Sequence, residues 1–306
     1  MGDFERRLNA KVKEVEKIIT AFLPEETGYQ KVVLEAMNYS VLAGGKRLRP
    51  MLMLETYRLF GGKGKEIEPF MAAIEMIHTY SLVHDDLPAM DNDEYRRGRK
   101  TTHVVYGEAF AILAGDGLLN MAFETALKAF GLTPNTDEIA KPGLFLGIAK
   151  SLEVLAQKAG MYGMIGGQTA DIAAEEKAEI SLNELLFIHE NKTAALIQAS
   201  MMIGALLAGA SEREVERIKK CAYNVGLAFQ IQDDILDVVG DEAELGKPIG
   251  SDAKNNKQTY VTMNGLDASA AKVKELSEEA MEIIDLVDGD GTFLKELITS
   301  LIYRTK

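Results

Sequence analysis

Apolar residues recur three and four positions apart along most of the chain, which is the spacing of one face of an α-helix. The segments that show this spacing most clearly are Val12–Phe22, Val32–Leu42, Phe70–Val83, Leu118–Phe130, Leu182–Ile188 and Val215–Ile235. Alternating runs rich in valine, isoleucine and threonine, which would predict β-strands, are nearly absent. The pattern therefore predicts an all-α protein built from long helices.

Glycine, proline and polar residues gather in four segments between these helices, and such clusters predict loops. The segments are Gly61–Lys65, Gly131–Gly143, Gly240–Gln258 and Asp288–Thr292. None of them resembles a long flexible linker, so we predict one domain over residues 1–306. Ser181 begins the sequence SLNE, a capping box that predicts the start of a helix.

The composition fits a folded protein and limits its partners. The chain of 306 residues is 47% hydrophobic and carries 34 basic and 47 acidic side chains, a net charge of -13. It is long enough to bury a substantial core. An acidic surface repels a nucleic-acid backbone, so we expect no nucleic-acid partner. A small phosphorylated substrate remains compatible, provided that basic side chains or metal ions gather at its site.

Two features favour a cytoplasmic protein. The single cysteine, Cys221, cannot form a disulfide within the chain, which suits a reducing compartment. The amino terminus mixes charges at helical spacing and does not resemble a signal peptide. The longest apolar stretch, Ala194–Ala210, is shorter than the roughly 20 residues that cross a bilayer, and it contains Gln198. We expect a buried helix there and no membrane span.

The last long apolar helix ends in a cluster of aspartates, Asp233, Asp234 and Asp237. Asp233 and Asp237 are four residues apart, so they share one helix face and repel each other. A bound cation would relieve this repulsion. An acidic, solvated helix face is an equally good explanation of this cluster alone.

A second aspartate cluster, Asp85, Asp86 and Asp91, follows another apolar helix. Pro88 disfavours helical continuation from the residue before it, so Asp91 is expected just past a break. Oxygen donors without cysteine or histidine favour Mg²⁺, which is commonly shared with phosphate oxygens. Two such clusters on apolar helices predict metal ions that hold a diphosphate, although either cluster alone could be a surface feature.

Basic residues are concentrated in short segments, as a phosphate site in an acidic protein requires. GGKRLRP contains Lys46, Arg47 and Arg49; RRGRKTTH contains Arg96, Arg97, Arg99 and Lys100; two later segments contain Lys192 with Thr193, and Lys247 with Lys257. His78 lies nearly two helical turns before Asp85 and shares its face. For each basic segment alone, a surface patch is the alternative, and a lone histidine is usually a core residue.

In this order, the segments GGKRLRP, IHTYSLVHDDLPAMDNDEYRRG, NKT, FQIQDDILD and GKPIGSD resemble the trans-isoprenyl diphosphate synthases, most closely the bacterial-type farnesyl and geranylgeranyl enzymes. The matching segments run from about Gly44 to Lys257. Lys100 departs from the pattern, because relatives typically have proline there. The resemblance implies a homodimer of helical bundles, each around a deep apolar cavity, that condenses allylic diphosphates with isopentenyl diphosphate.

The resemblance also implies a role for individual residues. Several Mg²⁺ ions would bind Asp85, Asp86, Asp91 and Asp233 and bridge the allylic diphosphate. The same diphosphate would be contacted by Arg96, Lys192, Thr193, Gln230, Lys247 and Lys257. Isopentenyl diphosphate would be held by Lys46, Arg49, His78 and Arg97. Catalysis would rest on the four aspartates and Lys192, with Asp237 acting through water or from the outer shell.

Product length would depend on Tyr80 and Ser81, which precede Asp85 by five and four residues. They lie about 6–8 Å down the helix, where a large ring would form the floor of the pocket. In the family, an aromatic residue at the Tyr80 position accompanies the C15 product, so we expect farnesyl diphosphate, with geranylgeranyl diphosphate as the alternative. Ordinary helix packing would also explain Tyr80.

Three other functions compete with this one. A terpene cyclase also ionises diphosphates, but it needs no second diphosphate site such as Lys46, Arg49 and His78 would form. An inactive partner subunit could lose aspartates or basic residues, and this chain keeps both sets. A metal-binding helical bundle would explain the aspartates but not the ordered basic segments.

Overall fold

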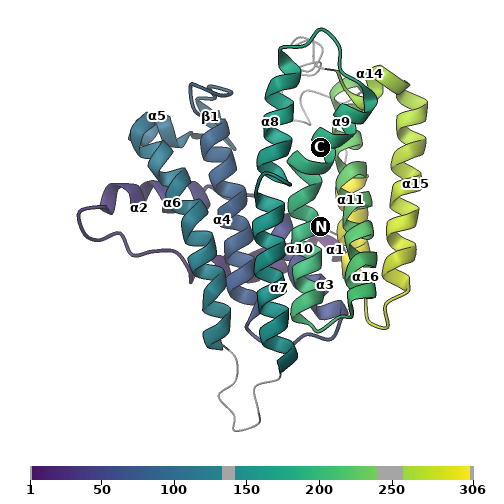
Figure 1. Ribbon diagram of the computed structural model, residues 1–306, viewed down its shortest axis with the longest axis horizontal. Coiled ribbons are helices and arrows are strands. Elements are labelled where there is room, and N and C mark those ends of the chain that lie inside the picture. The colour runs from purple at the N-terminus through teal and green to yellow at the C-terminus, as the bar shows by residue number, and fades with distance from the viewer. Residues whose placement is uncertain (1, 133–141, 240–257, 304–306) are drawn as a thin grey trace. The chain divides into compact units, whose positions relative to one another are not determined.

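The structure is a computed structural model that describes residues 2–132, 142–239 and 258–303 (Figure 1). It confirms the all-α prediction, since the strands in these ranges are two residues long. The chain forms two compact units: unit 1 contains Met1–Leu54 and Lys63–Leu152, and unit 2 contains Glu55–Gly62 and Glu153–Lys306. The single domain expected from the sequence stays a prediction.

Unit 1 is organised around α4, which packs against α1, α2 and α6 (Figure 1). Its helices are α1 (Asp3–Thr20), α2 (Lys31–Val41), the start of α3 (Leu48–Leu59), α4 (Ile67–Asp85), α5 (Thr102–Tyr106), α6 (Glu108–Leu127), the 3₁₀ helix η1 (Lys128–Leu132) and the start of α7 (Pro142–Ala159). Most of α4 is buried, including Phe70, Ile74 and Ile77. An apolar helix of this kind is stable only when neighbouring helices cover every side.

The end of α4 places the first aspartate cluster. The helix ends at Asp85, and Asp86 is its C-cap residue, as Pro88 predicts. The chain then turns back, and the backbone N–H of Asp91 donates to the carbonyl oxygen of Asp85 at 2.8 Å. The expected break is therefore confirmed, and the turn brings the backbone of the last aspartate close to the helix end.

A short antiparallel hairpin follows, formed by β1 (Tyr95–Arg96) and β2 (Arg99–Lys100). Arg97 and Gly98, at its tip, have φ angles of 53° and 73°. Two positive φ values are typical of the tight turns that join twisted strands. The hairpin gives the basic segment after the aspartates a fixed shape.

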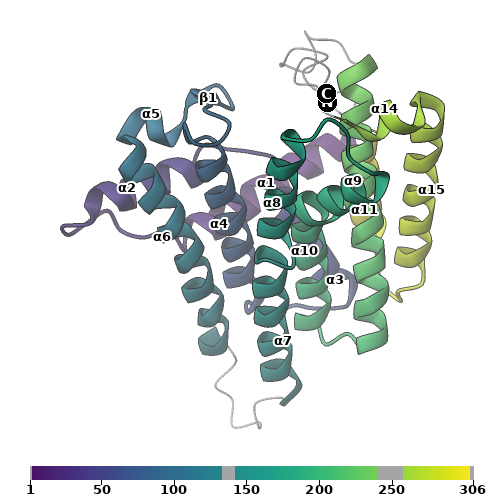
Figure 2. The same cartoon turned by 45° about the horizontal axis from the view of Figure 1, so that its top comes forward.

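Unit 2 is organised around α11, which packs against α10, α15 and α16 (Figure 1 and Figure 2). Its elements are the end of α3, the end of α7, α8 (Met164–Glu175), α9 (Leu182–Ile188), the π-helical turn η2 (His189–Ala194), α10 (Ala195–Leu207), α11 (Glu212–Val239), α14 (Tyr260–Asn264), α15 (Leu266–Asp285) and α16 (Thr292–Ile302). Nearly all of α10 is buried, which confirms the buried helix expected within Ala194–Ala210.

Some boundaries differ from expectation. The hydroxyl of Ser181 accepts from the backbone N–H of Glu184 at 3.2 Å, which confirms the helix start. The Glu184 carboxylate pairs with Lys177, so its side chain does not complete a capping box. Helix α7 begins at Pro142, inside the loop expected to run through Gly143. Among the described residues one segment, Glu108–Leu132, is long and apolar enough to cross a membrane, a test that core helices also pass.

Candidate active site

The loop between α2 and α3 carries the first basic segment in an unusual backbone shape. Gly44, Gly45 and Arg47 have φ angles of 83°, 135° and 47°. Glycine adopts such angles readily, whereas a residue with a Cβ does so only when its surroundings hold it there. The loop turns the Arg47 side chain into the protein, while Lys46 is exposed. The two neighbouring basic residues therefore have different environments.

Arg97, at the tip of the hairpin, lies against this loop. Its Nη1 donates to the carbonyl oxygen of Gly44. A Cβ on Gly45 would overlap the Arg97 guanidinium, so glycine is required for this close approach. Arg99 adds a second attachment, donating to the carbonyl oxygen of Leu42 at 3.2 Å. The hairpin and the loop thus form one basic surface.

Tyr39 on α2 fixes the other side of the hairpin. Its hydroxyl donates to the carbonyl oxygen of Lys100 at 2.7 Å, and the Arg99 guanidinium lies 4.3 Å from the centre of its ring. A cation over an aromatic face is attracted to the ring. Nothing in the sequence segments singled out Tyr39, because it lies outside the basic motifs.

The positive charges of this basic surface act on His78 and Arg49. Burial lowers the pKa of His78 well below its usual 6.5, and the positive charges of Arg49, Arg97, Arg96 and Arg47 lower it further. Burial also lowers the pKa of Arg49 to about 10, against the opposing effect of the Glu75 carboxylate. His78 is therefore neutral at pH 7, and a bound anion would relieve the repulsion among the cations.

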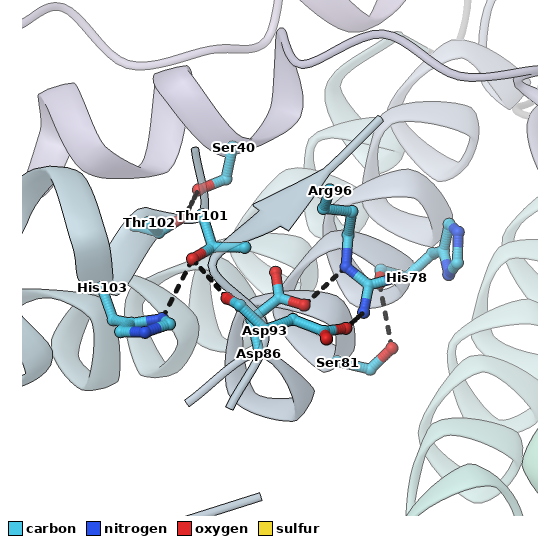
Figure 3. Close-up of polar contacts among 9 residues, drawn as sticks. All are labelled: Ser40, His78, Ser81, Asp86, Asp93, Arg96, Thr101, Thr102 and His103. Carbon is cyan, nitrogen blue, oxygen red and sulfur yellow. Dashed lines mark hydrogen bonds and ion pairs between the residues drawn. The ribbon is translucent and has the colours of Figure 1, made fainter. Parts of the chain in front are cut away.

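The first aspartate cluster is tied to Arg96, the first of the three hairpin arginines. Arg96 Nε donates to Asp86 Oδ1 at 2.6 Å, and its Nη2 lies 3.5 Å from Asp93 Oδ2 (Figure 3). Burial raises the pKa of Asp86, while the Arg96 charge and hydrogen bond lower it. Thr101 also bonds to the Asp93 carbonyl, at 2.7 Å. Asp85 is half-buried and Asp91 exposed, so both present carboxylates near the surface of unit 1.

In unit 2, Lys192 and Thr193 lie on the π-helical turn η2, a feature often found at functional sites. Lys192 Nζ donates to Asp171 Oδ2 on α8 at 2.5 Å. Thr193 Oγ1 donates to Gln230 Oε1 on α11 at 2.9 Å. Gly167 allows α8 to approach this turn, because a Cβ there would overlap the backbone of Lys192.

The second aspartate cluster lies near the carboxyl end of α11. Asp234 is buried and accepts from the backbone N–H of Tyr260 at 2.8 Å, and His189 Nε2 lies 3.8 Å from the same carboxylate. Asp237 is also buried, whereas Asp233 is half-buried. Asp233 is thus the most accessible carboxylate of the three. Lys247 and Lys257 lie outside the described residues.

The donor set fits Mg²⁺. Within the described ranges, no three acidic or histidine side chains form a preassembled metal cluster. Mg²⁺ does not require one, since it usually retains several waters and binds one or two carboxylates together with substrate phosphates. Asp85 and Asp91 offer hard oxygen ligands, and their backbones are already joined by a hydrogen bond.

Two buried carboxylates, those of Glu75 and Asp171, hold basic residues and were not predicted from the sequence. Glu75 interrupts the apolar run of α4 one turn before His78, and a lone acid in such a run was a usable signal. Asp171 lies in GGQTADIAA, and only the structure shows that it pairs with Lys192.

The chain is similar to known proteins over most of its length. Residues 30–287 match the model of the family described as polyprenyl synthetase. The chain is 44% identical to the farnesyl diphosphate synthase of Geobacillus stearothermophilus, covering 95% of this chain and 94% of the relative. It is also 44% identical to the geranylgeranyl diphosphate synthase of Cyanophora paradoxa, covering 95% and 93%.

A solved structure extends the likeness to three dimensions. Geranylgeranyl pyrophosphate synthetase from Pyrococcus horikoshii superimposes with a TM-score of 0.85 at 30% identity, over 99% of this chain and 98% of that one. The helices and their acidic and basic segments thus define a protein of the isoprenoid synthase fold. The chain belongs to the polyprenyl synthetase family.

Proposed function

We propose that the protein is a Mg²⁺-dependent short-chain prenyltransferase that makes farnesyl diphosphate. It would condense dimethylallyl or geranyl diphosphate head-to-tail with isopentenyl diphosphate and release diphosphate. The observation that carries the proposal is the basic surface of unit 1, where Arg97 and Arg99 of the hairpin donate to the carbonyl oxygens of Gly44 and Leu42 beside Lys46. The farnesyl diphosphate synthase of Geobacillus stearothermophilus, at 44% identity, supports it.

Isopentenyl diphosphate would bind Lys46, Arg49, His78 and Arg97. Arginine presents a planar fork to phosphate oxygens, lysine a point charge, and neutral imidazole one N–H donor. The structure joins the hairpin of Arg97 to the loop of Lys46 through Gly44. A diphosphate there would offset the arginine charges, which add to the effect of burial in lowering the pKa of His78.

The allylic diphosphate would be bound through Mg²⁺ and through basic and polar side chains. Asp85, Asp86 and Asp91 are proposed as Mg²⁺ ligands, with Asp233 as a further ligand from the second cluster. Arg96, Lys192, Thr193, Gln230, Lys247 and Lys257 are the proposed diphosphate contacts. Mg²⁺, when bound, would neutralise the diphosphate and make it a better leaving group. Asp86 and Asp171 would hold Arg96 and Lys192 in place for this contact.

The reaction follows from these roles. The bond between C1 and oxygen of the allylic substrate breaks, and diphosphate leaves with the electron pair. Arg96 and Lys192 stabilise the negative charge on the leaving oxygens, a preorganised electrostatic effect. The isopentenyl double bond then attacks C1, and a proton lost from the adjacent carbon restores a double bond. No side chain is an obvious base, so we assign that proton to the released diphosphate.

Tyr80 is proposed as the floor of the product pocket, with Ser81 beside it. Tyr80 is 5% exposed, and its ring lies edge-on to that of His84 with centroids 5.8 Å apart. This contact fixes the ring, as a floor requires. A floor at this position would limit the product to the C15 length. A C20 product is the second candidate, favoured by the equal identity to the Cyanophora enzyme.

We also propose that the protein acts as a cytoplasmic homodimer. Helix α6 exposes Phe110, Ile112 and Leu113 by 39%, 45% and 51%. Phe110 and Leu113 are three residues apart and share a helix face. Exposed apolar side chains that gather on one face mark protein interfaces, and a second copy would cover them. A mass near 67 kDa, about twice the 33.5 kDa of the chain, supports this, whereas a monomeric mass contradicts it.

One assay separates a synthase from a terpene cyclase. Release of inorganic diphosphate from geranyl diphosphate is followed with and without isopentenyl diphosphate. A synthase releases diphosphate in step with consumption of the second substrate. Rapid release that is indifferent to isopentenyl diphosphate would contradict the proposal and favour a cyclase.

A further inference from the structure

Glu75 and Arg47 form a buried ion pair beside the basic surface. Arg47 Nη1 lies 2.7 Å from Glu75 Oε1, and the two residues are 4% and 2% exposed. Arg47 Nη2 also donates to the carbonyl oxygen of Val41 at 2.8 Å. With the Arg47 guanidinium directed inward against α4, it is poorly placed to meet a ligand that enters from solvent.

The pair is coupled to the shape of the loop. Arg47 has a φ of 47°, in the left-handed region that a residue with a Cβ rarely adopts. Such conformations persist where several surrounding contacts hold the residue in place. Here the contacts with Glu75 and Val41 hold the side chain, while the same backbone carries Lys46 and Arg49 on either side.

The pair also counters the charge of the surface. The Glu75 carboxylate acts on Arg49 and Arg97 as well as on Arg47, and it raises the pKa of both Arg49 and Arg97 against the effect of burial. The buried Glu75 carboxylate thus offsets part of the repulsion among the cations of the loop and the hairpin. Among the described residues, removing Glu75 would leave Arg47 only the half-exposed carboxylate of Glu16, 3.7 Å from its Nε, and a buried charge that is weakly compensated is strongly unfavourable.

We propose that Arg47 and Glu75 are positioning residues that do not contact substrate but hold residues 44–49 in the shape that presents Lys46 and Arg49 to isopentenyl diphosphate. This inference rests on the proposed function of the same site. It gives Arg47 a different role from Lys46 and Arg49, a difference that the sequence alone does not show.

Calorimetric titration with isopentenyl diphosphate tests the inference without turnover. Glu75→Gln keeps the shape of the side chain and removes its charge, and we expect the Kd for isopentenyl diphosphate to rise about tenfold or more. The Kd for geranyl diphosphate, titrated in the same way, should change by less than about twofold, because that substrate uses other residues. Glu68→Gln, an acid on the same helix, is the matched control and should retain the wild-type values.

A folding defect is addressed by a second variant. Arg47→Met with Glu75→Leu replaces the pair by apolar side chains, a change that buried pairs often tolerate. We expect a folded protein, judged by circular dichroism and thermal unfolding, that still binds isopentenyl diphosphate about tenfold more weakly. Wild-type affinity in either folded variant, or equal losses for both substrates, would overturn the inference. A wild-type protein that binds but does not consume isopentenyl diphosphate would refute only the proposed function; one that does not bind it would refute both.

Discussion

Arg96 Nε lies 2.6 Å from Asp86 Oδ1, so a residue proposed to contact the allylic diphosphate is paired with a residue proposed to bind its metal. The pair lies where α4 ends and the hairpin begins, and Nη2 of the same guanidinium lies 3.5 Å from Asp93 Oδ2 (Figure 3). A charge-assisted bond of this length fixes both groups before chemistry begins. The position of Arg96 therefore depends on the carboxylate it contacts.

Arg96→Met should raise the KM for geranyl diphosphate by about tenfold to a hundredfold, the range expected from losing one charge-assisted hydrogen bond. The KM for isopentenyl diphosphate should change much less. Steady-state kinetics with each substrate varied in turn measures both. Lys100→Met, at an exposed residue of the same hairpin, is the control; a variant of Arg96 that behaves like it would refute the assignment.

The pair between Lys192 and Asp171 gives the corresponding prediction in unit 2. Lys192→Met should lower kcat by about a hundredfold or more, because stabilisation of the leaving diphosphate is lost. Asp171→Asn keeps the lysine charge but not its position, so we expect a smaller loss of about tenfold. Rapid-quench measurement of a single turnover separates this chemical step from product release. An Asp171→Asn enzyme with wild-type turnover would show that the 2.5 Å contact is not needed.

His78 should make the stability of the protein depend on pH. Its pKa in the folded protein lies well below 6.5, whereas a histidine in the unfolded chain titrates near that value. Below pH 6.5 the unfolded state therefore binds more protons. The stability conferred by a neutral His78 is complete above this pH and is lost as the pH falls.

The slope due to this one group reaches about 1.4 kcal/mol per pH unit. Urea unfolding at about pH 7.5 and about pH 5.5 should show a smaller loss for His78→Asn than for the wild-type protein. Parallel losses in the two proteins would contradict the low pKa of His78. Bound isopentenyl diphosphate adds negative charge near His78, so it should reduce the difference between the two proteins in the stability that they lose.

Tyr80→Ala should yield products longer than C15 from geranyl diphosphate, because the floor of the pocket is removed. Tyr80→Phe is a matched control, since the Tyr80 hydroxyl is buried without a hydrogen-bond partner among the described residues. We expect the Tyr80→Phe enzyme to keep the wild-type product. Chromatography of the products of each enzyme measures their chain length. An unchanged product in Tyr80→Ala would mean that the ring only packs the helix.

The sequence predicted the features that depend on local chemistry. The periodic apolar spacing located α2, α4, α9 and α11, and Pro88 located the end of α4 at Asp85. Ser181 marked the start of α9. These predictions succeeded because helical periodicity and proline geometry act over a few residues and need no knowledge of tertiary contacts.

Features that depend on tertiary contacts were not visible. Lys46 and Arg47 are adjacent and similar in sequence, yet only Arg47 is buried, because the left-handed backbone at that residue directs it towards Glu75. The partner of Lys192 lies 21 residues away on α8. The π-helical turn η2 also leaves no periodic signal in the sequence. It joins the regular helices α9 and α10 and differs from them only in the spacing of its backbone hydrogen bonds.

The most direct test of the proposed function is incorporation of labelled isopentenyl diphosphate by purified protein with Mg²⁺, supplied with dimethylallyl or geranyl diphosphate. We expect a C15 product from each starter, and its loss on addition of EDTA. A C20 product would retain the enzyme class and refute the role of Tyr80 as the floor. No incorporation from either starter, by folded protein with metal present, would contradict the proposed function itself.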